Sequence, residues 1–356
     1  MKKIDVRKLT KYVPLTREQF RQRFFERFYD PAFDQVKAEL ERVCEVAWDG
    51  YIQYRKSPRT RPAGRGFADP EFKLPLEWLA ARQAIREAER KRKTGPSRVL
   101  LVSGATRSEH TCPGEASKTR RLVNHAVEVL RKEKCEVDLL DLSALADEPW
   151  KVIHPCKTCV STAMPLCHWP CSCYPNHAMG QTNDWMNEIY PRWAAAHGVL
   201  IATPVNWYQV SSSLKLMMDR LVCADGGNPD PTRTHGKDPK RAKKIELDGW
   251  DFPKHLAGRA YAVVAHGDAE GPENVRDMLC AWLTSLGLHQ AGAQGALGTY
   301  IGYYEPYATS HDALDQDRDL FIEVGNAAHS LAELVRQMRA GTFRPPDAGL
   351  HDPRQK

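Results

Sequence analysis

The chain has 356 residues, a formal net charge of +6 and 42% hydrophobic residues, a length that suggests about two domains. No run approaches the roughly 20 apolar residues of a membrane helix, and the charged start at residues 1–8 lacks the apolar core of a secretory signal. We therefore expect a cytoplasmic protein with no membrane partner. Ten cysteines are too few for a disulfide scaffold at this length.

Residues 1–97 differ in charge from the rest of the chain. They hold 23 Lys and Arg against 14 Asp and Glu, whereas residues 98–356 hold 28 against 31. Apolar periodicity predicts helices at 16–29, 34–54 and 76–93, with an Arg-, Pro- and Gly-rich loop at 57–70. Basic residues alternate with acidic ones here, so we expect a solvated helical extension and no nucleic-acid partner. A surface for an acidic partner is the alternative.

The first predicted strand of the following region, residues 99–103, leads into a loop rich in phosphate-binding side chains. Gly104 opens the loop, and apolar positions at helical spacing predict a helix from Ser117 to Glu133. Free N–H groups and the positive end of a helix dipole bind phosphate. The loop contains neither the Gly-x-Gly-x-x-Gly nor the Walker lysine pattern, and an ordinary strand-to-helix turn is the alternative. The candidate phosphate donors are Thr106, Arg107, Ser108, Ser117, Lys118 and Thr119.

Half of the cysteines crowd between the second predicted strand, 137–142, and the third, 198–202. They are Cys156, Cys159, Cys167, Cys171 and Cys173. A Cys-x-x-Cys pair brings two thiolates within reach of one metal ion, and later thiolates complete a tetrahedral set. The pattern permits zinc or an iron–sulfur cluster, with His154, His168 and His177 as further candidate ligands. Unligated structural or redox-active thiols are the alternative, because ligands need matching spacing and geometry.

The third strand runs into an unusual loop and helix at 203–220. A proline ends strand pairing, two aromatic residues follow in the turn, and a serine cluster caps the helix. Ligands bind at the carboxyl edge of an open parallel sheet, so this loop predicts a flat platform for a planar ligand. The platform residues are Pro204, Val205, Asn206, Trp207 and Tyr208.

The fourth predicted strand, 260–265, ends in a small polar loop that is expected to form the opposite wall. Gly267 permits close backbone approach, and His266 and Asp268 are candidate hydrogen-bond partners of the ligand. An ordinary polar turn is the alternative. An aromatic loop at 298–307 is expected to line the same mouth.

Strands alternate with helices from residue 98 to residue 340, which predicts an α/β fold with a doubly wound five-stranded parallel sheet. A weak strand at 290–296 and a helix at 320–338 complete the pattern. The helical extension 1–97 precedes this domain and a tail, 341–356, follows it. We expect the polar insertion 224–255 to cover the site or to contact a second subunit.

These two loops give the chain a family resemblance. It resembles the flavodoxin-like, NAD(P)H-dependent FMN reductases, in the branch related to iron–sulfur flavoproteins. The residues that carry the resemblance are Gly104, Thr106, Arg107, Ser117 and Thr119, then Thr203, Pro204, Trp207, Leu214, Lys215, Asp219 and Arg220.

The resemblance implies bound FMN, with its phosphate at the helix start near Ser117 and its ring against 204–208 and 266–268. Electrons then pass from NAD(P)H through FMN to an unidentified acceptor, the chemistry resides on the flavin without a catalytic side chain, and a homo-oligomer is expected. One alternative is an electron-transfer protein of the iron–sulfur flavoprotein type that uses the cysteines at 156–173. The other is a non-catalytic scaffold or binding protein with a basic arm.

Overall fold

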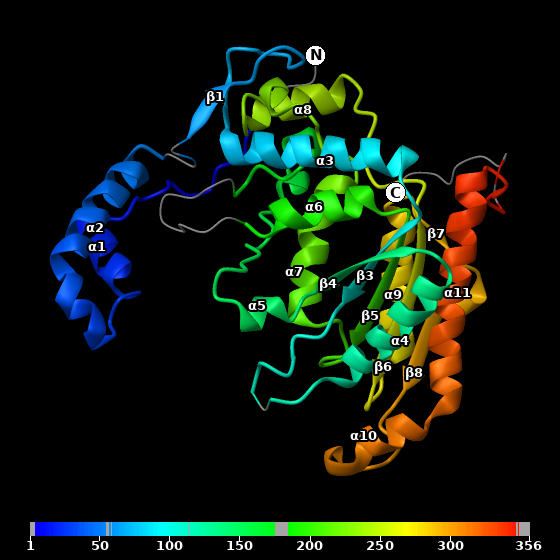
Figure 1. The fold of residues 1–356 in the computed structure, drawn as a ribbon. Coiled ribbons are helices and arrows are strands. Elements are labelled where there is room, and N and C mark those ends of the chain that lie inside the picture. Colours follow the sequence, from blue (N-terminus) through cyan, green and yellow to red (C-terminus); the bar gives the residue numbers. More distant parts are fainter. Residues whose placement is uncertain are drawn as a thin grey trace.

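The central sheet consists of parallel strands in the order β4-β3-β5-β6-β7, with β8 also paired to β6. A computed structural model describes residues 4–54, 57, 59–112, 114–174, 184–346 and 348. Figure 1 shows helices on both faces of this sheet. The strands are β3 (Arg98–Ser103), β4 (Glu136–Asp141), β5 (Gly198–Pro204), β6 (Ala260–Gly267), β7 (His289–Gln290) and β8 (Ala296–Tyr300).

This order confirms the predicted flavodoxin-like α/β fold. The fifth strand differs from the prediction at 290–296, because it is split into β7 and β8, which both lie along β6. Gly292 adopts a left-handed φ of 65° and a 3₁₀ turn covers Ala293–Gly295, so the chain leaves the sheet between the two pieces. Among the helices of the described part, none combines the length and apolar character needed to cross a membrane.

Alternate side chains of the buried strands pack into two separate hydrophobic cores, one on each face of the sheet. On β3, Val99 and Leu101 face one core, whereas Leu100 and Val102 face the other, as the period of a strand requires. The first core is covered by α4 (Lys118–Lys132) and α11 (Arg318–Ala340). The second is covered by α3 (Leu76–Thr94), α6 (Met186–Ala195), α7 (Ser212–Arg220) and α9 (Pro272–Ser285).

The N-terminal extension has two parts. A hairpin of α1 (Arg17–Phe25) and α2 (Lys37–Ile52) packs around its own buried cluster and lies to one side of the sheet in Figure 1. The loop predicted at 57–70 instead contains β1 (Thr60–Pro62), which pairs antiparallel with β2 (Lys73–Pro75). The third helix, α3, belongs to the main body, since Ile85 lies in the core of the sheet.

The remaining helices are α5 (Ala144–Asp147), α8 (Pro239–Leu247) and α10 (Tyr307–Gln316). We expected the insertion at 224–255 to cover the site, but its helix α8 packs through Ala242 against Ala163 and Leu166 of the cysteine-rich segment. In Figure 1, α8 lies at the opposite end of the molecule from α10. The helix of the insertion therefore packs against the cysteine segment and does not cover the carboxyl edge of the sheet.

Candidate functional site

The loop after β3 begins with a glycine that packs directly against β5. The Gly104 N–H donates to the Ala202 carbonyl at 2.7 Å, and a Cβ at this position would lie 2.6 Å from Thr203 Oγ1. No side chain fits there, so glycine is required by close approach. The Ser211 hydroxyl donates to the Gly104 carbonyl at 2.5 Å and also caps α7, which ties this loop to the segment after β5.

The start of α4 presents the donors expected of a phosphate site. Ser117 caps the helix by accepting the Arg120 N–H at 3.2 Å, while the first N–H groups of the helix have no intrahelical acceptor. The Lys118 ammonium donates to the Ile301 carbonyl at 2.8 Å, and burial lowers the pKa of Lys118. An anion at this helix start therefore meets backbone donors, hydroxyls and a partly desolvated cation.

The end of β6 supplies a buried, neutral imidazole. His266 Nε2 and Thr119 Oγ1 lie 2.9 Å apart and share a hydrogen bond between β6 and α4. Burial, aided by the Lys118 charge, lowers the pKa of His266 to about 4. His266 is therefore uncharged at neutral pH. Beside it, the Tyr307 hydroxyl is hydrogen-bonded to Asp268, which raises the pKa of Tyr307.

The loop after β5 is a tight hairpin that exposes two aromatic rings. The Val205 N–H donates to the His266 carbonyl at 2.8 Å, and Asn206 and Gln209 exchange two backbone hydrogen bonds. Trp207 and Tyr208 between them both adopt left-handed conformations, with φ of 49° and 65°. Trp207 is 94% exposed and Tyr208 64%. Bulky residues rarely adopt such dihedrals, and strained turns of this kind cluster at functional sites.

A cavity of about 240 Å³ lies where these segments meet, at the carboxyl ends of β3, β5 and β6. This is the point at which the strand order reverses, between β3 and β5. Eleven of the fourteen predicted cofactor residues line it: Thr106, Arg107, Ser117, Lys118, Thr119, Pro204, Val205, Asn206, His266, Gly267 and Asp268.

Three predicted residues lie outside this lining. The Ser108 hydroxyl turns to the Asp147 carboxylate on α5, and Trp207 and Tyr208 project at the rim. Three further lining residues, Ala105, Ile301 and Tyr307, were not among the predicted cofactor residues. The aromatic loop at 298–307 was the signal for the last two, because its position after β8 places it at the same edge of the sheet.

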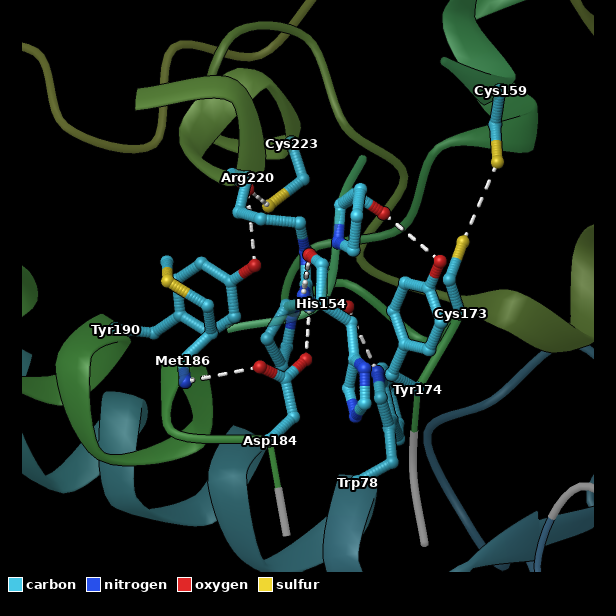
Figure 2. A network of polar contacts seen from close by, with 12 residues as sticks. Trp78, His154, Cys159, Cys173, Tyr174, Asp184, Met186, Tyr190, Arg220 and Cys223 are labelled. Carbon is cyan, nitrogen blue, oxygen red and sulfur yellow. Dashed lines mark hydrogen bonds and ion pairs between the residues drawn. The ribbon is translucent and has the colours of Figure 1, made fainter. Parts of the chain in front are cut away.

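The cysteine segment forms a different environment. Among the described residues, no group of three or more His, Cys, Asp or Glu side chains is arranged to hold a metal ion. Instead, the Cys159 and Cys173 thiols face each other with their sulfurs 3.5 Å apart (Figure 2). The hydrogen bond from the Cys173 thiol, together with the Lys237 ammonium, lowers the pKa of Cys159 to about 6 against the effect of burial.

The other three cysteines have different surroundings, and Cys171 also contacts Cys173. Cys156 Sγ accepts the Thr158 N–H at 3.3 Å. Burial raises the pKa of Cys167 well above its ordinary value, and hydrogen bonding to Cys173 followed by burial does the same for Cys171. These two thiols are therefore protonated at neutral pH.

The candidate histidine ligands have other contacts. His154 stacks on Tyr174 with ring centroids 4.7 Å apart. His168 is fully buried and hydrogen-bonds Ser172 Oγ at 2.6 Å and Thr234 Oγ1 at 2.8 Å. His177 lies outside the described residues.

A buried ion pair anchors both ends of this segment. Arg220, at the end of α7, pairs with Asp184, and both side chains are almost completely buried. Arg220 also donates to the His154 carbonyl at 2.9 Å, and the Tyr190 hydroxyl donates to the Arg220 carbonyl at 3.0 Å (Figure 2). The motif residue Arg220 therefore acts in the structure as a buried clamp, far along α7 from the pocket.

An open parallel sheet with helices on both faces and a pocket at its switch point defines the class of doubly wound α/β proteins. Within that class, comparison with known protein families identifies one family. The model of the NADPH-dependent FMN reductase family matches residues 97–301, and the chain belongs to this family. It is thus an enzyme of a flavin-dependent NAD(P)H oxidoreductase family. The comparisons give no support to the finer resemblance to iron–sulfur flavoproteins.

Several solved structures are distantly similar. RosB with a bound 8-demethyl-8-formylriboflavin-5′-phosphate intermediate has 15% identity and a TM-score of 0.46, with 69% of this chain and 82% of that chain covered. The azoreductase from Bacillus anthracis strain Sterne has 12% identity and a TM-score of 0.34, with 68% of this chain and 99% of that chain covered. The apo form of the NADH:FMN oxidoreductase EMOB has 14% identity and a TM-score of 0.36, with 70% of this chain and 92% of that chain covered. No curated protein matches the chain.

Proposed function

We propose that this chain binds FMN in the pocket at the carboxyl edge of the sheet and passes electrons from NAD(P)H to an acceptor. The observation that carries the proposal is the convergence of three separate segments, 104–119, 204–206 and 266–268, on one cavity. The donors of this cavity fit the cofactor of the family, because a helix start, hydroxyls and two cations suit a phosphate. When bound, FMN supplies the hydride and electron chemistry.

The residues of the pocket then have distinct roles. Ser117, Lys118 and Thr119 would hold the phosphate, with Arg107 adding a charge from the loop that precedes α4. The segment 204–206 and Gly267 would bound the ring, because they line the cavity from two sides and glycine permits close approach. Neutral His266 fixes α4 to β6 without placing a positive charge in the pocket.

The exposed aromatic residues at the rim suit planar reactants. Trp207, Tyr208 and Tyr307 surround the mouth and leave large areas of ring uncovered. Such rings offer stacking surface to the nicotinamide and to an aromatic acceptor. We also propose a homo-oligomer, because exposed apolar surface of this kind is often covered by another subunit.

A comparison of two flavins tests the pocket. Apoprotein titrated with FMN should quench flavin fluorescence, and Arg107→Gln should weaken FMN binding about 10- to 100-fold through loss of a charge-assisted bond. Riboflavin, which lacks the phosphate, should bind wild type and variant equally. Arg131→Gln, which removes an exposed cation at the far end of α4, is the control and should bind FMN normally. Protein that stays colourless and ignores added FMN overturns the proposal.

A further inference from the structure

Cys159 and Cys173 form a close thiol pair that the flavin chemistry does not use. Cys159 begins a 3₁₀ turn, Cys159–Ser161, and Cys173 lies 14 residues later. Figure 2 shows the two thiols pointing toward each other, with their sulfurs 3.5 Å apart. A disulfide has an S–S length of about 2.05 Å, so bond formation requires an approach of about 1.5 Å.

Cys156, the other member of the Cys-x-x-Cys motif, is directed elsewhere. Thr158 between the two cysteines adopts a left-handed conformation with φ of 48°, and its N–H donates to Cys156 Sγ. Cys156 lines a cavity of about 480 Å³ together with Lys215 and Trp282. The thiol in contact with Cys159 is therefore Cys173.

The surroundings divide the two thiols into unequal roles. The Lys237 ammonium donates to the Leu166 carbonyl at 3.0 Å and lies 3.9 Å from Cys159 Sγ, where it favours a thiolate. Cys159 is partly exposed, whereas Cys173 is buried. An external reagent therefore reaches Cys159 first, and Cys173 is placed to react from the inner side.

We propose that Cys159 and Cys173 form a redox-active dithiol that reduces small disulfides by thiol–disulfide exchange. The Cys159 thiolate attacks one sulfur of the substrate disulfide, which forms a mixed disulfide and releases one thiolate. Cys173 loses its proton to that thiolate and attacks the Cys159 sulfur. The Cys159–Cys173 bond forms and the second thiolate leaves. The cysteine pair is oxidised by two electrons, and the substrate is reduced to one thiol and one thiolate.

This site is separate from the flavin pocket. The start of α7 contacts the pocket loop through Ser213 and Thr106, whereas its last residue, Arg220, lies beside the cysteine segment (Figure 2). A nine-residue helix spans about 13 Å. The proposed exchange needs only a disulfide from solution, so the dithiol and the flavin proposal fail or succeed independently.

Peptide mapping after oxidation tests the pairing. Reduced full-length protein is exposed to oxidised glutathione without oxygen, and free thiols are then blocked. Trypsin cuts after Lys157 and next after Arg192, so a Cys159–Cys173 bond closes a loop within one peptide, whereas a Cys156–Cys159 bond joins two peptides. A second cut after Leu166 separates Cys159 from Cys167, Cys171 and Cys173, and fragmentation then identifies Cys173 as the partner if Cys167 and Cys171 carry the blocking group. We expect the closed loop and no retained glutathione.

Variants assign the two roles. Cys173→Ser should trap glutathione on Cys159, Cys159→Ser should take up none in this segment, and the control Cys156→Ser should behave as wild type. Lys237→Met should slow mixed-disulfide formation several-fold at neutral pH, whereas Lys240→Met, on the exposed face of α8, should not. FMN content and NAD(P)H oxidation should be unchanged in the cysteine variants, which also reports that they are folded.

Four results would overturn the proposal. They are a Cys156–Cys159 bond, glutathione retained on the wild-type protein, thiols that remain reduced in excess oxidised glutathione, and a stoichiometric metal ion on these cysteines in freshly purified protein. The wild-type map alone decides the pairing, so the test does not depend on any variant folding.

Discussion

The pocket proposed to bind FMN and the cysteine segment are built in opposite ways. The pocket unites residues from 104–119, 204–206 and 266–268, which backbone hydrogen bonds hold at one edge of a regular sheet. The cysteines at 156–173 are close in sequence and lie on irregular backbone, where Cys159 contacts Cys173 across 14 residues and Cys156 accepts the Thr158 N–H. Sheet topology thus gathers distant residues reproducibly, whereas proximity in sequence does not ensure proximity of side chains.

The largest expected effect concerns the ion pair that fixes the cysteine segment to α7. Arg220→Met leaves the buried Asp184 carboxylate without its partner, and such losses cost about 3–5 kcal/mol. We expect the free energy of unfolding in urea to fall by this amount. The double variant Arg220→Met/Asp184→Leu should recover part of it, because no unpaired charge then remains.

The control for this prediction is on the same helix. Lys215 pairs with Asp219 on the exposed face of α7, and Lys215→Met should change stability by no more than about 1 kcal/mol. If Arg220→Met costs as little as Lys215→Met, the Arg220–Asp184 pair does not anchor the segment.

The second prediction concerns acid stability of the pocket. Burial lowers the pKa of His266 from 6.5 to about 4. Between pH 6.5 and pH 4 this residue is therefore protonated in the unfolded chain and neutral in the folded chain. Stability is therefore fully present above pH 6.5 and falls as the pH drops toward 4, by roughly 3 kcal/mol from this residue. Urea unfolding at several pH values should show this loss in the wild type.

His266→Gln isolates this contribution. The variant lacks the imidazole. Between pH 6.5 and 4 its free energy of unfolding should therefore fall by roughly 3 kcal/mol less than that of the wild type. An unchanged pH profile in His266→Gln would show that His266 is already protonated in the folded pocket.

The third prediction tests the contact between the loops of β3 and β5. Gly104→Ala introduces a Cβ 2.6 Å from Thr203 Oγ1 and 2.8 Å from Thr203 Cβ, which forces the loops apart. Overpacking of this kind costs about 1–3 kcal/mol. FMN affinity should fall as well, because the displaced loop carries Thr106 and Arg107. Gly64→Ala, in a loop with open space, is the control for FMN affinity, which should be unchanged, although its φ of 83° makes alanine costly for stability there.

The sequence predicts the pocket well because its residues stand at the ends of strands. Once the apolar runs at 99–103, 198–202 and 260–265 are assigned as neighbouring parallel strands, their following loops must meet at one edge. The split fifth strand escaped prediction because a positive φ at Gly292 interrupts a weak apolar pattern. That interruption depends on dihedral angles that composition does not reveal.

Long-range contacts limit what the sequence predicts in the same way. The hydroxyl of Ser108 is taken by Asp147, 39 residues away, so a local motif cannot place it in or out of the pocket. Cys-x-x-Cys suggests that Cys156 and Cys159 act together, but the thiol in contact with Cys159 is that of Cys173, 14 residues later. Long-range side-chain partners and single backbone rotations therefore set the limit of what the sequence predicts.

The smallest stability effect, and the sharpest test of the pocket rim, concerns Trp207. Its left-handed conformation is costly for a bulky residue, and at 94% exposure its ring gains little from burial. Trp207→Asn should therefore stabilise the protein by about 0.5–1 kcal/mol in urea unfolding, because asparagine tolerates this conformation. If the ring stacks on a reactant, the KM for NAD(P)H or for an aromatic acceptor should rise roughly fivefold.

A matched control separates strain from function. Tyr54 is also exposed and left-handed, with φ of 51°, but it lies at the end of α2 in the N-terminal extension. Tyr54→Asn should relieve similar strain without any change in KM. Unchanged kinetics in Trp207→Asn would mean that the rim does not contact the reactants. A gain in stability together with a raised KM would instead show that the strained turn is retained for binding at the rim.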